Sequence, residues 1–244
     1  MISTVDEQSR HVHKSVQRRQ DGYKAHIAVE PDTGIVTDCA LTQANGAANH
    51  EAAIGLQLLD SEDTEVTVLA DSAYGTGEFR AALAERGHGD RVKSAPLRPA
   101  VPDGFTVDDF QVDRAGGIAV CPAGVSRSIS VAGNAVFGVS CHGCELRSRC
   151  TTATKGRTLR IKRHDALQRS ARLESRNPQW LNEYRQHRPM VERAIAWLTR
   201  GNRKLRYRGT ARNDQWLHHR VAALNLRRMI TMGLTRTADT WALA

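Results

Sequence analysis

Apolar residues in the first part of the chain alternate between strand spacing and helix spacing. Residues 22–29 alternate apolar and polar side chains and predict a strand, and residues 35–41 predict its partner in a hairpin. Residues 66–70 form a short continuous apolar run, which is typical of a buried parallel strand. Helices are predicted at residues 50–59 and 78–86, and a further strand at residues 91–95. This order predicts a mixed α/β sheet with helices on its faces.

Other parts of the chain do not follow this order of strands and helices. Residues 1–20 are polar and charged, and we expect a loop or arm there. Residues 96–160 hold four prolines and four of the five cysteines, which predicts an insertion outside the main sheet. An apolar stripe predicts a helix at residues 189–200, with Pro189 in its first turn, and a second helix spans residues 214–232. We therefore divide the chain into a sheet-forming part (1–95), an insertion with a cysteine cluster (96–160) and a helical, Arg-rich C-terminal part (161–244).

Charge is distributed unevenly over the 244 residues, whose formal net charge is +9. Residues 1–146 carry 12 Lys and Arg against 20 Asp and Glu, whereas residues 147–236 carry 23 against 5. Arg predominates in the basic part, and its guanidinium group binds phosphate bidentately. The asymmetry predicts nucleic acid as a partner, and a basic surface without a ligand is the alternative.

Two sequence features bear on location. No run of 18 or more apolar residues is present, and the N-terminal residues lack the basic-then-apolar pattern of a signal peptide. We expect no membrane partner and a cytoplasmic location.

Two carboxylates stand at positions suited to chemistry. Asp71 follows the predicted strand 66–70 directly, and ligands of open α/β sheets bind outside the carboxyl ends of the strands. Glu192 borders the apolar stripe of helix 189–200, where a carboxylate needs a partner. One interpretation makes both residues ligands of a hard cation such as Mg²⁺. The alternatives are that Asp71 caps the following helix and that Glu192 forms an ordinary ion pair with Arg188.

The sequence around these acids resembles a known family. Asp71 lies in Leu69-Ala70-Asp71-Ser72-Ala73-Tyr74-Gly75, and Glu192 lies in Arg188-Pro189-Met190-Val191-Glu192-Arg193. Both segments are similar to those around the second and third acids of DDE transposases, the ribonuclease H-fold enzymes of bacterial insertion sequences. Further matching segments are Gly22-Tyr23-Lys24-Ala25-His26, Arg206-Tyr207-Arg208-Gly209 and Ala223-Leu224-Asn225-Leu226-Arg227-Arg228. The similarity extends from about Ser3 to Leu234.

This resemblance implies a ribonuclease H-like mixed sheet with flanking helices and a DNA transposase activity. Two Mg²⁺ ions would be held by Asp71, Glu192 and a further acid, and would promote DNA strand cleavage and strand transfer. The implied partners are the DNA ends of the insertion sequence, target DNA and a second copy of the chain in a homodimer, at the bacterial nucleoid. The residues that we expect to contact DNA are Arg188, Arg193, Arg200, Arg203, Lys204, Arg206 and Arg208.

One part of the family pattern is absent. The first acid of the family ends a strand that precedes the hairpin, and here only Asp6 is a candidate for it. We therefore expect an N-terminally truncated and inactive copy of a transposase. The sequence leaves undecided whether this chain is itself an enzyme. The alternative is a non-catalytic DNA-binding remnant. Family members also carry a Tyr before the Arg, for which Tyr184 is close in spacing, and a Lys after the Glu, a position that falls here at Thr199-Arg200.

The cysteines leave two interpretations open. Cys121, Cys141, Cys144 and Cys150 lie in the predicted insertion, with Cys141 and Cys144 in C-x2-C spacing. One such pair is half of the usual signal for a four-thiolate zinc site. Zinc binding and buried reduced thiols are therefore both considered. Cys39, inside a predicted strand, is expected to be a small core residue.

Overall fold

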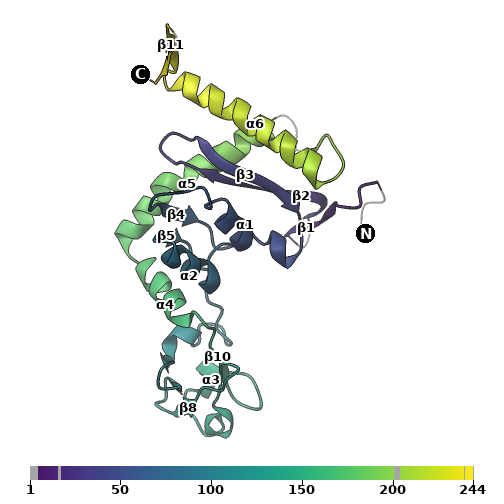
Figure 1. Cartoon of the computed structure of the whole chain (residues 1–244). Helices are drawn as coiled ribbons and strands as arrows, with labels where there is room; N and C mark the ends of the chain where they lie inside the picture. The colour runs from purple at the N-terminus through teal and green to yellow at the C-terminus, as the bar shows by residue number, and fades with distance from the viewer. Residues whose placement is uncertain (1–4, 16–17, 201–203, 239, 244) are drawn as a thin grey trace. The chain divides into compact units, whose positions relative to one another are not determined.

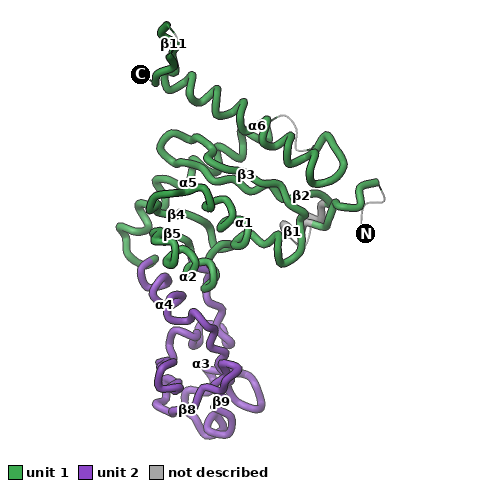
Figure 2. The backbone as a smooth tube through the Cα atoms, in the orientation of Figure 1, with its two compact units in different colours: residues 1–93, 175–244 green, residues 94–174 purple. Residues whose placement is uncertain are grey.

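The computed structural model describes residues 5–15, 18–200, 204–238 and 240–243. It divides into two compact units, shown in different colours in Figure 2. Unit 1 is made of residues 1–93 and 175–244, and unit 2 of residues 94–174. The insertion predicted at 96–160 lies inside unit 2, which also contains the segment up to residue 174. Unit 1 is therefore discontinuous in sequence, and its strands and its long helices come from opposite ends of the chain.

The predicted hairpin is the first sheet of unit 1. Its strands β2 (Arg18–Val29) and β3 (Val36–Gln43) pair antiparallel. The turn between them places Gly34 at φ +73°, where a Cβ atom would lie 2.8 Å from the Met190 sulfur. Glycine therefore meets both a backbone and a space requirement at this turn.

A third strand precedes the hairpin, so the loop or arm predicted for residues 1–20 is wrong over this stretch. Strand β1 (Arg10–Ser15) pairs antiparallel with the first residues of β2. His11 lies opposite Asp21 in the register, and their side chains are 2.5 Å apart. The backbone ladder and this cross-strand pair order a segment that has too few apolar residues to show strand periodicity.

A second sheet of unit 1 contains the strand that ends at Asp71. Strands β4 (Thr67–Ala70) and β5 (Gly89–Val92) pair in parallel, and the helices of this region are α1 (Glu51–Gln57) and α2 (Gly77–Glu85). Phe79 and Leu83 of α2 are buried with Val92 in a common core. Residues 68–70 are only half-buried, which differs from the fully buried strand predicted. Within the described residues β4 pairs with β5 alone, so its other edge is open.

Two 22-residue helices complete unit 1. Helices α5 (Pro178–Thr199) and α6 (Thr210–Thr231) pack on the hairpin, with α6 alongside β3 (Figure 1). Their shared core is formed by Val36, Cys39, Leu41, Ala194, Leu198, Leu217 and Val221. Asn225 of α6 accepts from the Val36 N–H at 2.9 Å and donates to the Val36 carbonyl at 2.8 Å. These bonds satisfy backbone groups of β3 that would otherwise form an open sheet edge.

Helix α5 begins at Pro178, where the sequence pattern turns helical, and continues without a break through the segment 189–200 that was predicted as a helix of its own. Asn177 caps it by accepting from the Gln179 N–H at 2.8 Å, and Pro178 occupies the first turn. Pro189, which was expected to start the helix, lies in its interior. A proline there removes one helix hydrogen bond. Burial of Trp180 and Tyr184 before it, and of Ala194 and Leu198 after it, holds both halves in one helix.

Unit 2 is built from short elements. Its strands are β6 (Gln111–Asp113), β7 (Ile118–Val120) and β8 (Ser126–Ser128) in one sheet, and β9 (Asn134–Val136) and β10 (Thr158–Arg160) in another. Its helices include α3 (Arg147–Cys150) and α4 (Asp165–Glu174). Phe110 and Phe137 lie at the centre of its own core, with ring centroids 5.6 Å apart. Arg172 of α4 binds Asp108 bidentately, with both N–O distances below 2.8 Å. No helix in the described parts of the chain is long and apolar enough to span a membrane.

Candidate active site

Asp71 lies in the turn that follows β4. Its Oδ1 atom accepts from the Ala73 N–H at 2.9 Å, while the residue is solvent-exposed. The other carboxylate oxygen, Oδ2, has no hydrogen-bond partner among the described residues. At Gly75 a Cβ atom would lie 2.6 Å from the Lys93 carbonyl oxygen, so only glycine allows the turn to pass this close to the end of β5. The alternative that Asp71 caps the following helix is wrong, because the cap of α2 is Thr76, whose hydroxyl accepts from the Phe79 N–H at 3.1 Å. Asp71 instead orders the turn through one oxygen, and its other oxygen remains available.

Helix α5 presents three functional side chains spaced four residues apart. Arg188 donates from Nη1 to the Tyr184 hydroxyl at 2.7 Å and from Nε to a carboxylate oxygen of Glu192 at 2.9 Å. Tyr184 is buried, and its ring stacks on Trp180 with centroids 5.3 Å apart. Glu192 keeps 64% of its side chain exposed. The predicted ion pair of Glu192 and Arg188 thus forms, and it is one link of a longer hydrogen-bonded row.

Electrostatics connect the two carboxylates. Burial raises the pKa of Tyr184, Arg188 opposes this, and both Asp71 and Glu192 raise it further. Asp71 also acts on Tyr74, whose pKa is raised to about 12 by burial first and then by Asp71 and Glu51. Helix α5, which carries Tyr184 and Glu192, contacts β4, the strand that Asp71 follows. Asp71 and Glu192 thus belong to contacting elements from the two separate sequence segments of unit 1.

The two acids fit a single hard divalent cation better than a pair of ions. Mg²⁺ is commonly held by one or two carboxylates together with waters and substrate phosphates. Asp71 and Glu192 are both exposed carboxylates, which suits this mode. Across the described residues, no set of three or more His, Cys, Asp or Glu side chains is arranged to hold a metal. A two-ion site would need ligands beyond these two residues.

Asp6, the candidate for the first acid, makes contacts elsewhere in unit 1. Its Oδ2 accepts from the Tyr23 hydroxyl at 2.7 Å and from the Gly209 N–H at 3.2 Å, and its Oδ1 accepts from the Gln8 N–H at 3.1 Å. Burial favours a higher pKa for Asp6, but these hydrogen bonds outweigh it and lower the pKa below its ordinary value. The bonds fix the N-terminal segment against the start of α6. This is a structural role that its sequence position did not predict.

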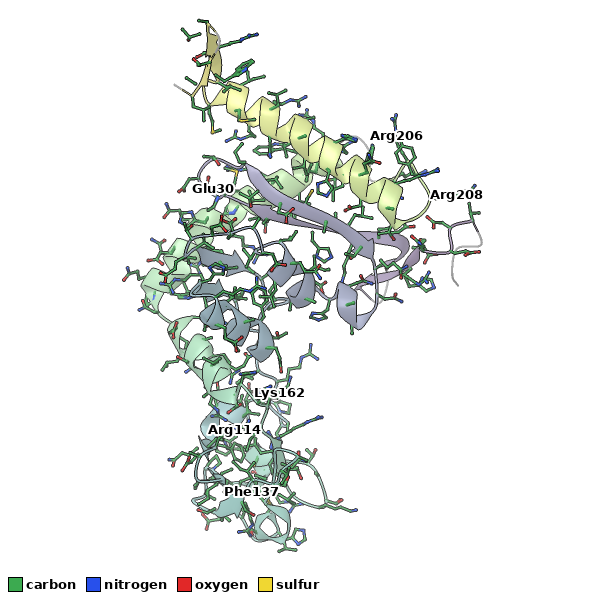
Figure 3. All side chains as sticks on the ribbon, viewed as in Figure 1. Glu30, Arg114, Phe137, Lys162, Arg206 and Arg208 are labelled. Carbon is green, nitrogen blue, oxygen red and sulfur yellow. The ribbon has the colours of Figure 1, made fainter. Side chains whose placement is uncertain are left out.

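The predicted DNA-contacting residues differ in their surroundings. Arg193 and Arg200 are exposed on or just after α5, and their side chains form no hydrogen bond or ion pair with the described residues. Lys204 is exposed, and Arg203 lies outside the described residues. Arg206 and Arg208 are exposed in the loop before α6, as Figure 3 shows. The fully buried Asn213 holds this loop, since it bonds the backbone of Tyr207 and the Gly209 carbonyl.

The sequence pattern of the second helix placed Arg220, Arg227 and Arg228 on its outer side, and of these three only Arg227 is exposed, whereas Arg185 and Arg212 were missed. Arg185, Arg212 and Arg227 are exposed and have no side-chain partner in the described parts of the chain. Arg227 also lines a cleft of about 430 Å³ between α5 and α6, which Arg200 and Trp197 line as well. The sequence signal for these arginines was their position on the helix face opposite the apolar stripe, because charged residues on that face are exposed to solvent.

Many other arginines of the basic region are used inside the protein. In unit 2, Arg169 donates to Asp165 and to two backbone carbonyls, and Arg172 binds Asp108. In unit 1, Arg228 lies over the Trp197 ring at 5.3 Å and donates from Nε to the Thr33 carbonyl at 2.9 Å. The charge asymmetry in the sequence therefore overstates the charge that is available to DNA.

The four cysteines of unit 2 meet at one place. Cys121, Cys141, Cys144 and Cys150 line the same cavity. Burial raises the pKa of Cys150, Arg157 lowers it, and the other three cysteines raise it. All five cysteines are free thiols. Cys39 is 4% exposed in the core of unit 1, as expected, and burial is the main cause that raises its pKa to about 11.

Comparison with known families identifies the protein. Two family models match, each described as a transposase DDE domain, one over residues 2–99 and the other over residues 120–230. The first match includes the turn that carries Asp71, and the second includes the helix that carries Glu192. No curated protein and no solved structure matches. The chain belongs to the DDE transposases, which confirms the predicted family.

Membership of this family defines the fold, the activity and the partner at a coarse level. The mixed α/β architecture is that of the ribonuclease H-like DDE domain. The function is that of a DNA transposase, which acts on DNA and depends on a divalent metal ion.

Proposed function

We propose that Asp71 and Glu192 are the metal-binding acids of this transposase. The observation that carries the proposal is that two exposed carboxylates lie on contacting elements, Asp71 directly after β4 and Glu192 on α5. Asp71 offers its unpartnered Oδ2, and Glu192 offers the oxygen that Arg188 does not bind. Mg²⁺ is the ion that this ligand type favours. When bound, it would stabilise charge on the phosphodiester oxygens and activate the attacking oxygen.

Arg188 has a second role in this proposal. In the structure it spans Tyr184 and Glu192, and it is 42% exposed. A DNA phosphate would compete with Glu192 for the same guanidinium group, because phosphate accepts bidentate hydrogen bonds from Arg. Arrival of DNA would then release the Glu192 carboxylate toward the metal. Tyr184, held by burial and by Trp180, keeps Arg188 in place during this exchange.

The DNA-binding surface that we propose lies on α5, on α6 and in the loop between them. It comprises the exposed residues Arg185, Arg193, Arg200, Arg206, Arg208, Arg212 and Arg227. These guanidinium groups have no protein partners in the described parts of the chain, so binding phosphate would not break existing ion pairs. The element ends and target DNA are the proposed ligands, and we propose that two copies of the chain assemble on paired ends.

Cleavage of a supercoiled plasmid that carries the DNA flanking the coding sequence tests the assignment. With Mg²⁺ or Mn²⁺ present, Asp71→Asn and Glu192→Gln should each lower the nicking rate by at least about 100-fold. Loss of an outer-shell partner typically costs only about 10–100-fold, so the size of the effect identifies direct ligands. Asp63→Asn, which changes an exposed acid without a described partner, is the matched control and should keep the rate. Nicking that survives either of the first two substitutions would refute the assignment.

A second candidate function is DNA binding without cleavage. It is favoured by the finding that the described residues hold no set of three metal-binding side chains. In that case the unaltered chain would bind the same plasmid in a gel-shift assay, and Mg²⁺ and Mn²⁺ would both fail to produce nicks. Nicking by the unaltered chain that Asp71→Asn abolishes would exclude this alternative.

A further inference from the structure

The cavity lined by four cysteines in unit 2 has the size of a single atom. Its volume is about 20 Å³, slightly more than the roughly 10–15 Å³ that one water molecule requires. Cys121 follows β7, Cys141 ends the short helix Gly138–Cys141, and Cys150 ends α3. Cys144 lies in the turn between the helix that ends at Cys141 and α3. The remaining lining is largely apolar, with Phe105, Phe110 and Phe137 among it.

Arg157 provides hydrogen-bond donors at this cavity. Its backbone N–H donates to the Cys141 sulfur at 3.4 Å, and its Nη1 donates to the Cys150 carbonyl at 3.3 Å. Its Nε is buried and has no hydrogen-bond partner among the described residues. A buried N–H without an acceptor is unusual in proteins and points to a group that the protein alone does not supply. A nearby anionic cluster would compensate this buried positive charge.

Arg147 is a second arginine that provides hydrogen-bond donors at this cavity. Arg147 of α3 donates from Nη1 to the Cys141 carbonyl at 3.0 Å and from Nη2 to the Ala153 carbonyl at 3.0 Å. It is one of the residues that line the cavity. Two guanidinium groups thus lie beside four thiols in a mostly apolar setting. These cations would offset part of the negative charge of a thiolate cluster.

We propose that Cys121, Cys141, Cys144 and Cys150 bind one zinc ion as a structural tetrathiolate site. Each thiol would lose its proton to solvent, and four Zn–S bonds of roughly 2.3 Å would form. Four thiolates and Zn²⁺ carry a net charge of −2, which Arg147 and Arg157 would offset. The described side chains are not yet arranged at metal-binding distances, so binding requires the thiols to turn toward the cavity.

The architecture of unit 2 explains why a metal would be useful there. Each of its five strands has three residues, and its sheets contain three and two strands. Such small units bury little apolar surface and are commonly stabilised by a metal or by disulfides. A zinc ion would join β7, the helix that ends at Cys141 and α3 around one point. The proposal concerns unit 2 alone and does not depend on the active-site assignment in unit 1.

Metal analysis of the full chain tests this proposal. Protein purified under reducing conditions without added metal should contain about one zinc per chain, and Cys144→Ser should lower this content at least about tenfold. Cys39→Ser is the matched control, because Cys39 lies in the core of unit 1, and it should retain the zinc. A content below one tenth of a zinc per chain in the unaltered protein would overturn the proposal, as would retention of zinc by Cys144→Ser.

A second measurement covers the case in which Cys144→Ser fails to fold. Co²⁺ added to the metal-free, unaltered chain should produce the thiolate-to-cobalt charge-transfer band of a tetrahedral site, and zinc should remove it. Alkylation of the native protein followed by mass spectrometry should find the four thiols protected by zinc and reactive after chelation. Rapid alkylation regardless of zinc, or disulfides among these cysteines, would count against the site.

Discussion

Units 1 and 2 use the same residue types for different purposes. In unit 2, arginines such as Arg169 and Arg172 bind acids and backbone carbonyls of their own unit. In unit 1, arginines on the outer faces of α5 and α6, such as Arg193 and Arg227, have no partner among the described residues. An arginine that cross-links a small core is not available to a ligand. Positive charge in this sequence therefore has two uses, bonds inside the protein, which occur in both units, and potential DNA contacts on the outer faces of α5 and α6.

The units also differ in how their sites are assembled. The carboxylates of unit 1 come from β4 and α5, which are separated in sequence by the whole of unit 2. The cysteines of unit 2 lie within residues 121–150 and are joined by local turns. A site built from distant elements needs the complete fold of its unit, whereas a local cluster needs only nearby turns. The following predictions test this difference.

DNA binding should show the largest effect. If six to ten guanidinium groups of unit 1 bind phosphates, affinity should fall by about 10³–10⁵ between 50 and 200 mM salt. Replacing Arg193, Arg206 and Arg208 by Ala should reduce the slope of log affinity against log salt by about three, since each contact contributes roughly 0.9. The measurement is fluorescence anisotropy with a labelled duplex at several salt concentrations.

The matched control removes three exposed charges from unit 2, at Lys155, Arg160 and Arg163. These substitutions should leave the salt slope within about one of the unaltered value. An equal loss of slope in both variants would show that the two units share the DNA contacts. Affinity that does not change with salt would contradict the proposed surface altogether.

Core truncation in unit 2 should have the next largest effect. Phe137 is 1% exposed and packs on Phe110, so Phe137→Ala should destabilise unit 2 by about 3–5 kcal/mol. Hydrogen exchange followed by mass spectrometry should then show lost protection in residues 94–174 and unchanged protection in β2, β3, α5 and α6. Val131→Ala, at a fully exposed position, is the control and should change stability by less than about 0.5 kcal/mol. Loss of protection in both units would mean that they unfold together.

Alkaline pH should produce the smallest effect, confined to unit 1. The pKa of Tyr23 is raised to about 12, first by burial and then by its hydrogen bond to Asp6 and the charge of Asp6. A folded-state pKa above the unfolded value of about 10 stabilises the protein fully below pH 10, and this stabilisation is lost as pH rises from about 10 to about 12. Thermal unfolding of the chain should therefore lose part of its stability in this window, and Tyr23→Phe should lose less. Identical pH profiles for the two proteins would show that the Asp6–Tyr23 bond does not stabilise unit 1.

The sequence alone determined the features that depend on local patterns. The alternation in residues 22–29 and 35–41 predicted the hairpin, and the apolar run before Asp71 placed this acid at a strand end. The segments around Asp71 and Glu192 were sufficient to predict the family. Local backbone preferences and side-chain periodicity act over a few residues, and a single sequence displays them directly.

Only the tertiary structure decided which side chains have partners. Pro189 lies inside α5 because buried residues on both sides of it outweigh one lost hydrogen bond. Asp6 is bound by Tyr23 and Gly209, and the strand before Asp71 contacts the helix that carries Glu192, through contacts between segments far apart in the chain. Such contacts depend on how elements pack against one another, and residue type or spacing within one segment carries little information about it.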